Sequence, residues 1–268
     1  MRISKFFNLY VQFILIISLL VAIQYIQSNF QKPSLFVSKQ DSSINLNPKL
    51  VSITSLGHKR LISSLFWIFT ILESDYEHYK QKDLNSWMYL RFKFISELDP
   101  HFLQTYTFGG LYLSIIKDDI PGATEIYRKG LALFPRNKEL IKDAFYHFYF
   151  QANDREFARN LLRNNLDLIK NETPLLSLLA RHESSEGNLD LAYNILKNRL
   201  ATLNENSPLY LKIRNSLYAI KSEKDLSCLN NSKNIEACEK NDLEGEKYIL
   251  KNNQYYAKKN WEPFKIKK

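Results

Sequence analysis

The sequence predicts an all-α fold: a solenoid of helical hairpins that follows an N-terminal transmembrane helix and ends in a small appendage with a disulfide and a β-hairpin. Ala123, Ala158 and Ala192 lie 35 and 34 residues apart and open similar blocks. A charge-free apolar run covers residues 6–26, and two cysteines lie near the C-terminal end. Glycine and proline are too few for large sheets with many tight turns, which favours helices.

Residues 1–5 are expected in the cytoplasm and residues 6–26 in the membrane. Twenty-one residues at 1.5 Å each cover about 30 Å, the hydrocarbon thickness of a bilayer. Arg2 and Lys5 precede the run, so the positive-inside rule places the rest of the chain outside the cytoplasm. A cleaved secretion signal and a buried core helix are the alternatives. The first lacks an A-x-A-like cleavage site.

The polar, serine-rich residues 27–47 are expected to form a linker, and residues 48–222 the solenoid. Pro48 predicts the first turn of a helix with Leu50, Ile53 and Leu56, which Gly57 interrupts. The apolar stretch Leu61 to Leu72 is too short for a second span. We expect it to be a core helix that packs on the first repeat, with a re-entrant segment as the alternative.

Second helices are predicted from the alanine blocks. A small residue allows close approach to the first helix of the same hairpin, and the large residue four positions later fills the adjacent space on the same face. Proline then stops the helix. The blocks are Ala123, Tyr127, Gly130, Pro135; Ala158, Leu162; Ala192, Leu196; and, one period upstream, Met88, Phe92, Ile95, Pro100.

First helices are predicted before each block, joined to it by turn-forming residues. Their ranges are Phe69 to Gln81, Gln104 to Lys117, Glu139 to Gln151 and Thr173 to Glu186. The turns are Lys82-Asp83, Lys117 to Pro121, Ala152 to Asp154 and Gly187-Asn188. This pattern resembles the tetratricopeptide (TPR) repeat, with degenerate repeats at about 69–103, 104–138, 139–172 and 173–206 and a capping helix at 207–222. An unrelated helical bundle with coincidental alanines is the alternative.

The C-terminal residues 223–268 have a different character. The capping helix is expected to run from Pro208 to about Ser222. Cys228 and Cys238 favour a disulfide if this segment lies outside the cytoplasm; two free thiols are the alternative. Gly245 to Lys258 predicts a β-hairpin with its turn at Lys251 to Asn253. The aromatic tail with Trp261 and Phe264 is either a cap docked on the solenoid or a partner-binding arm.

No pattern indicates catalysis, a cofactor or a metal. The histidines 58, 78, 101, 147 and 182 have no ligand spacing, and neither a phosphate loop nor a nucleophile motif is present. The formal charge of +9 is spread over the chain and matched by nearby acids, so we expect no nucleic-acid partner. The chain is therefore expected not to be an enzyme.

The TPR resemblance implies a groove, lined by first helices, that binds peptides or partner segments. Carried over by repeat position, the groove residues would be Glu73, Glu77, Phe108, Tyr112, Asp143, His147, Ser177 and Arg181. Ordinary interhelical packing is the alternative role for each. These positions lack the lysine, asparagine and arginine clamp of the chaperone-binding members, so chaperone-tail binding is not expected.

Together these observations predict a scaffold or adaptor in a bacterial inner membrane, with a single span and its C-terminal domain in the periplasm. It would bind protein segments in the assembly of an envelope or secretion complex. Two alternatives remain: an accessory subunit or enzyme of cell-wall or polysaccharide metabolism, and a secreted soluble binding protein. Membrane washing that releases the mature chain would favour the last.

Overall fold

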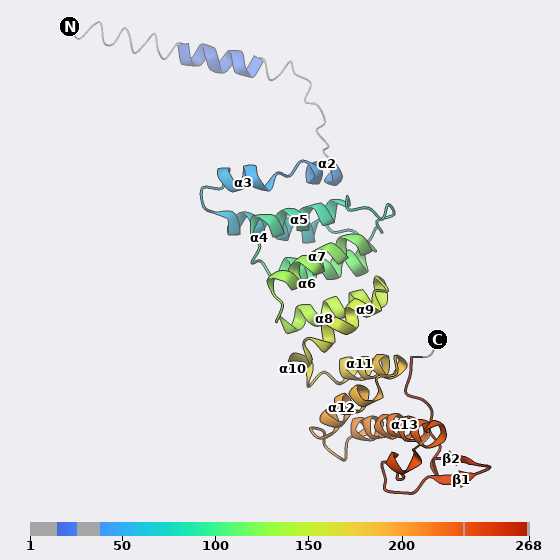
Figure 1. Ribbon diagram of the computed structural model, residues 1–268. Helices are drawn as coiled ribbons and strands as arrows, with labels where there is room; N and C mark the ends of the chain where they lie inside the picture. Colours follow the sequence, from blue (N-terminus) through green and yellow to red (C-terminus); the bar gives the residue numbers. More distant parts are fainter. Residues whose placement is uncertain (1–14, 26–37, 233, 267–268) are drawn as a thin grey trace. The chain divides into compact units, whose positions relative to one another are not determined.

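The computed structural model describes residues 15–25, 38–232 and 234–266, and the chain divides into two compact units, Met1–Ser42 and Ser43–Lys268 (Figure 1). The described residues are mostly helical and include little strand, as the sequence predicted. A disulfide closes the C-terminal part of the second unit.

The first unit contains part of the predicted membrane span. Residues 15–25 are helical; residues 1–14 and 26, which complete the N-terminus and the span, lie outside the described residues. Within the described ranges, none of the helices combines the length and apolar content that a bilayer crossing requires.

The predicted linker 27–47 is not entirely irregular, because it contains helix α2 (Lys39–Ile44). Its residues 27–37 lie outside the described part of the chain. The Ser38 Oγ accepts a hydrogen bond from the Asp41 backbone N–H (3.0 Å) and donates one to the Asp41 carboxylate (2.6 Å). This local pairing starts a helix in a polar segment, much as a capping box does.

The second unit is a succession of helices in chain order (Figure 1). Most helices pack on helices one or two places away in the chain: α3 and α4 on α5, α6 on α7 and α8, α11 on α12, and α12 on α13. The helices are α3 (Pro48–Thr54), α4 (Lys59–Leu72), α5 (Trp87–Leu98), α6 (Gln104–Leu111) with the π turn η1 (Tyr112–Ile116), α7 (Ile120–Leu133), α8 (Lys138–Tyr146) with the π turn η2 (His147–Gln151), α9 (Arg155–Arg163), α10 (Leu166–Ile169), α11 (Thr173–Ser185), α12 (Leu189–Leu200) and α13 (Pro208–Asn231).

Short polar side chains fix where second helices begin. The Ser86 side chain accepts from the Tyr89 N–H, Asp119 from the Gly122 N–H and Asp154 from the Phe157 N–H. Each bond satisfies a backbone donor that has no partner within its own helix. These caps start α5, α7 and α9 within a few residues of the alanine blocks.

The turns between paired helices repeat with the same period. Asp118, Asn153 and Gly187 adopt positive φ angles of 52°, 54° and 86° and lie 35 and 34 residues apart. Asp, Asn and Gly are the residue types that enter the left-handed region most readily. The turns between paired helices therefore recur at the same spacing as Ala123, Ala158 and Ala192.

The alanines and the large residues of the alanine blocks lie in the core, as predicted. Ala123, Ala158 and Ala192 are fully buried, and so are the large residues four positions on, Tyr127, Leu162 and Leu196. At Gly130 the helices approach so closely that an added Cβ would lie 2.6 Å from the Cβ of Tyr106 on α6. The small residue on the second helix thus sets the distance between α6 and α7.

The first helix predicted at Phe69 to Gln81 is wrong. The helix is α4, which begins ten residues earlier at Lys59 and ends at Leu72. Its apolar side chains stop there, and the Ser74 hydroxyl donates to the Ile71 carbonyl at 2.7 Å, which terminates the helix. Residues 73–86 form a long connection instead, and Lys82, predicted as a turn residue, lies within it at a φ of 46°.

Several predictions for the ends of the second unit are confirmed. Helix α3 begins at Pro48, with Asn47 as its N-cap. Cys228 and Cys238 form a disulfide. Strands β1 (Ile249–Lys251) and β2 (Gln254–Tyr256) pair antiparallel, with Ile249 opposite Tyr256. The turn is shorter than predicted: Asn252 and Asn253 alone form it, both at positive φ, as a two-residue hairpin of this kind requires.

Helix α13 continues nine residues beyond the predicted end at Ser222. Leu229 on the extra turns is buried with Cys238 and Tyr248, and Leu226 and Tyr255 pack against them. This small cluster exists only because the disulfide and the hairpin fold back on the helix. The extension is therefore stabilised by tertiary contact, which the local sequence does not reveal.

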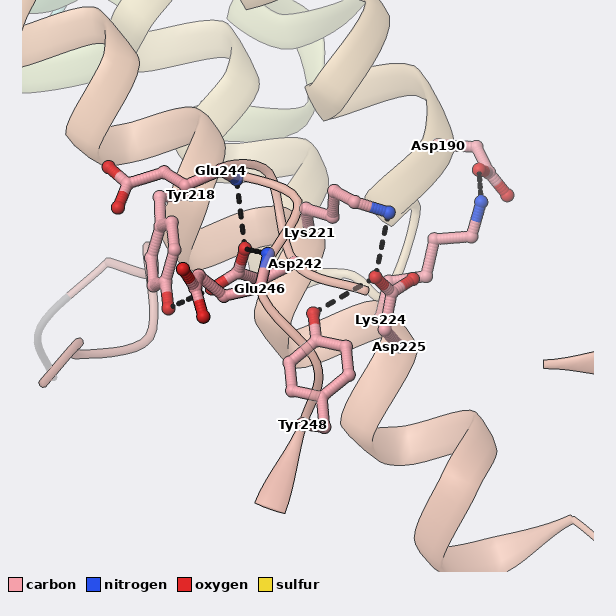
Figure 2. Close-up of polar contacts among 9 residues, drawn as sticks. All are labelled: Asp190, Tyr218, Lys221, Lys224, Asp225, Asp242, Glu244, Glu246 and Tyr248. Carbon is pink, nitrogen blue, oxygen red and sulfur yellow. Dashed lines mark hydrogen bonds and ion pairs between the residues drawn. The ribbon is translucent and has the colours of Figure 1, made fainter. Parts of the chain in front are cut away.

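Two reciprocal tyrosine–aspartate hydrogen bonds fasten the segment after the disulfide to α13 (Figure 2). Tyr218 on α13 donates to Asp242 at 2.9 Å, and Tyr248 donates to Asp225 on α13 at 3.0 Å. Asp242 also accepts the backbone N–H groups of Glu244 and Glu246, each at 2.9 Å. Because both carboxylates are buried, these bonds satisfy groups that would otherwise be costly to desolvate.

The close approach at Gly130 generates a testable prediction. Gly130→Ala should lower the free energy of unfolding by about 1–3 kcal/mol, because the Tyr106 Cβ is close to the backbone and cannot move aside. Gly109→Ala on α6 is the matched control, since its Cβ would meet only the Phe92 ring at 3.3 Å. Urea unfolding followed by circular dichroism measures both. Equal effects of the two substitutions would contradict the close contact as a constraint.

Candidate partner-binding surface

The first helices of the hairpins expose one face with a common spacing. On α4 its positions are Leu61, Leu65, Ile68 and Leu72; on α6 and η1 they are Gln104, Phe108, Leu111 and Ile115; on α8 and η2 they are Glu139, Asp143, Tyr146 and Phe150. Each set follows i, i+4, i+7, i+11, the spacing of one side of a helix. We call these positions the first-helix face.

Most of the first-helix face is apolar and exposed. Its large apolar side chains are between 37% and 75% exposed, from Leu111 to Leu72. On α8 the Tyr146 and Phe150 rings stack at 6.1 Å with an interplanar angle of 15°. Helices α6 and α8 pack against each other, so their parts of the face belong to neighbouring elements. Exposed apolar side chains grouped in this way are typical of interaction surfaces.

On α8 the first two positions of the first-helix face are acidic. Glu139 is exposed, and Asp143 is half-buried with a pKa raised by burial. The raised pKa means that the ionised carboxylate of Asp143 is less well solvated than a surface acid. A cationic group near Asp143 would therefore be stabilised. The first-helix face is thus mostly apolar on α4 and α6 and acidic at the start of α8.

The predicted groove residues Glu73 and Glu77 lie beyond the end of α4, in the connection 73–86. Glu73 pairs with Arg91 on α5 at 2.6 Å, and Glu77 is exposed. Arg91 also donates to the Ser43 hydroxyl at 3.1 Å. The structure therefore places Glu73 in a contact that fastens the connection to α5, away from the first-helix face.

Of the predicted residues on α6 and α8, Phe108 and Asp143 lie on the first-helix face and Tyr112 and His147 lie beside it. Phe108 is 53% exposed, whereas Tyr112 is half-buried. His147 is buried at 2% exposure. Phe108 and Asp143 occupy equivalent positions 35 residues apart, so the structure brings this pair onto neighbouring helices.

His147 joins three elements of the core. Its Nδ1 lies 3.0 Å from the Ser114 hydroxyl of η1, and its Nε2 lies 2.8 Å from the Thr124 hydroxyl of α7. Its ring packs on that of Tyr127 at 5.1 Å. Burial lowers the pKa of His147 to about 4, so the imidazole is neutral at physiological pH. These contacts make His147 a packing residue.

On α11 the equivalent positions are small: Thr173, Ser177, Ala180 and Ser184. The predicted residue Ser177 is half-buried there, and Arg181 is half-buried beside it. The Arg181 guanidinium lies 4.7 Å from the ring of Phe264, which belongs to the C-terminal tail. The chain's own tail therefore covers Arg181. Unlike Phe108, Arg181 does not occupy a position of the first-helix face.

Sequence reasoning missed most of the apolar members of the face. Leu111, Ile115, Tyr146 and Phe150 are absent from the predicted groove residues, and Leu61 to Leu72 was predicted to be a core helix. The signal that could have found them is the i, i+4, i+7, i+11 series counted from the first turn of each first helix. In a repeat protein these positions share one environment.

Among the described residues, no group of three histidine, cysteine, aspartate or glutamate side chains is arranged to hold a metal ion. The buried carboxylate of Glu183 accepts from Asn188 at 2.8 Å and lies 3.9 Å and 3.7 Å from the Nε atoms of Arg159 and Arg163. It links α11 to α9.

The buried histidine generates a prediction of pH dependence. Because the pKa of His147 is about 4 when folded and 6.5 when unfolded, its contribution to stability is complete above pH 6.5 and is lost as the pH falls toward 4. Between about pH 7 and about pH 4.5 we expect a loss on the order of 2 kcal/mol from this group alone. Urea unfolding at both pH values should show a correspondingly smaller loss for His147→Gln. The same loss in both proteins would contradict the buried neutral imidazole.

Comparison with protein-family models, curated proteins and solved structures finds no match to this chain. A proposal for its function therefore depends on the surface and the contacts described above.

Proposed function

We propose that this protein is a membrane-anchored scaffold with a TPR-like solenoid that binds a segment of a protein partner on its first-helix face. The C-terminal unit would lie outside the cytoplasm of a bacterial cell, attached to the inner membrane, and would serve the assembly of an envelope or secretion complex. The single observation that carries the proposal is the apolar first-helix face, repeated on α4, α6 and α8.

The solenoid part of the proposal is supported by the period of the chain. Buried alanines and positive-φ turns recur at 34 or 35 residues, and the N-capping aspartates Asp119 and Asp154 lie 35 residues apart. Helices contact their neighbours in sequence, as expected where each repeat packs only on the adjacent ones. Helix α13 and the segment fastened to it by Tyr218 and Tyr248 would then cap the last repeat.

The partner's chemistry follows from the face. Leu61 to Leu72 on α4 and Phe108 to Ile115 on α6 and η1 offer apolar contact, and α8 adds two aromatic rings and the acids Glu139 and Asp143. A matching segment would present apolar or aromatic side chains along most of its length and a basic residue opposite α8. Aromatic anchors of this kind dominate binding energy at protein interfaces.

The membrane anchor is supported by the chain before the second unit. The helix at residues 15–25 exposes large apolar side chains, among them Leu15, Leu19 and Leu20 at more than half their surface. These residues belong to the charge-free run 6–26, which follows Arg2 and Lys5. The Cys228–Cys238 disulfide is of a type that persists in oxidising compartments, which favours a location outside the cytoplasm.

Site-specific crosslinking tests the proposal. A benzophenone amino acid placed at Leu111 in the full chain should form an adduct with the partner in native membranes. The added substitution Phe108→Asp should lower the adduct yield at least tenfold, because a charge in the apolar face costs well over 1.4 kcal/mol. The matched control carries the same crosslinker at Leu211 on α13, which is 56% exposed and lies off the face.

Equal yields from Leu111 and Leu211, or no effect of Phe108→Asp, would refute the first-helix face as the binding surface. The same membranes test the anchor, since an alkaline wash should leave the full chain in the pellet. Release of the intact chain by that wash would refute the anchor and leave the binding surface as a separate question.

A further inference from the structure

The C-terminal tail, residues 260–266, runs back from the β-hairpin to α11 (Figure 1). It forms neither helix nor strand. Its Phe264 is buried at 9% exposure beneath the Arg181 guanidinium, 4.7 Å away, and Trp261 packs on the edge of the core. The backbone N–H of Ile266 donates to the Ser185 hydroxyl at 2.9 Å. An extended segment with aromatic anchors thus lies on a first helix of this chain.

Helix α11 has room for such a segment because its side chains are small. Ala180 stands where α6 has Leu111 and α8 has Tyr146, and Ser184 stands where they have Ile115 and Phe150. Arg181 supplies a flat cation for an aromatic ring, and Ser185 supplies an acceptor for a backbone N–H. The tail contacts α11 at Arg181 and Ser185, the residues that directly follow Ala180 and Ser184.

The tail is held mainly by side-chain contacts, with one backbone hydrogen bond to α11. A cavity of about 590 Å³ separates it from polar side chains of α13, among them Lys212, Asn215 and Ser216. A second cavity of about 900 Å³ begins at Ile266 and is lined by Arg155, Arg159 and His182. Close packing is normal where a segment belongs permanently to a core. Solvent-open pockets border the tail at α13 and at Ile266, so the tail lies at the surface of the second unit.

We propose that the surface of α11 around Arg181 and Ser185 is a docking site for an extended Trp-x-Pro-Phe segment, occupied here by the chain's own tail. A partner segment of the same kind displaces the tail and binds in its place. The tail thus shields this part of the surface until such a segment arrives. The inference rests on the proposed function, because displacement of the tail has a functional effect only if the first helices bind partners.

The contacts favour an extended segment over a helical partner. The Ile266 N–H is satisfied by a side chain of α11, which a helix would not need for its own backbone. Pro263 disfavours the helical conformation at the residue before it, Glu262. Phe264 is the main anchor, and Lys265 adds an ion pair with Glu223 on α13.

A labelled peptide with the sequence of residues 258–266, KKNWEPFKI, provides the probe. Binding to the full chain is measured by fluorescence anisotropy, with the chain in detergent. Phe264→Ala in the chain removes the anchor of its own tail, and this variant should bind the peptide at least tenfold more tightly than the wild type. The double variant Arg181→Ala/Phe264→Ala should lose that gain, and a peptide with alanine in place of its phenylalanine should not bind.

Equal binding of the peptide by the wild type and the Phe264→Ala variant, or binding to neither, would overturn the proposal and leave the tail as a fixed cap. Ile53→Asp in the Phe264→Ala background is the matched control and should bind the peptide normally, since Ile53 is 76% exposed on α3 and belongs to neither proposed binding surface. The crosslinking position Leu111 lies on α6, outside the α11 site. The peptide result is therefore independent of the crosslinking result at Leu111, and the two proposals fail separately.

Hydrogen exchange in the wild-type chain gives a second measurement that needs no substitution. The Ile266 amide should exchange at least a hundredfold faster than core amides of α11, because the tail opens locally. Exchange of Ile266 at the rate of α11 would mean that the tail leaves only when the unit unfolds, and would overturn the proposal.

Discussion

The close approach of the two helices within a hairpin is the constraint on which the second unit depends. Ala123, Ala158 and Ala192 are fully buried, and at Gly130 even a methyl group would meet the Tyr106 Cβ at 2.6 Å. At such distances the helices interlock by shape, and most of the buried surface of a first helix faces its own second helix and the adjacent hairpins. The side of the first helix that remains is the first-helix face.

That face changes in character along the chain. On α4 and α6 it is mostly apolar, and on α8 it combines acids with stacked aromatic rings. On α11 the equivalent residues are small, and the adjacent Arg181 contacts the chain's own tail. The change follows from equivalent positions on successive helices being filled by different residues.

The C-terminal segment stabilises the end of this arrangement by a different kind of interaction. The disulfide, the hairpin and the Tyr218–Asp242 and Tyr248–Asp225 hydrogen bonds attach it to α13 (Figure 2). Buried carboxylates are tolerated only when such partners are present, so these bonds also specify how the segment sits. The tail beyond Lys259 is attached differently, by the buried Phe264 under Arg181, by Trp261, by the Lys265–Glu223 ion pair and by one backbone N–H.

The sequence by itself determined the helical content, the spacing of the second helices around Ala123 and Ala158, the turn residues and the disulfide, because these depend on local chemistry that recurs with the repeat. Only the tertiary structure decided the position of the first helix at α4, the length of α13 and which side chains are exposed. His147 shows the reason: its sequence position matches Tyr112 and Arg181, yet hydroxyl groups from two other elements surround it and bury it. The exposure of a side chain is set by neighbours that are distant in sequence. The contact between Arg181 and Phe264 of the tail is the clearest case, because most of the C-terminal third of the chain separates these two residues.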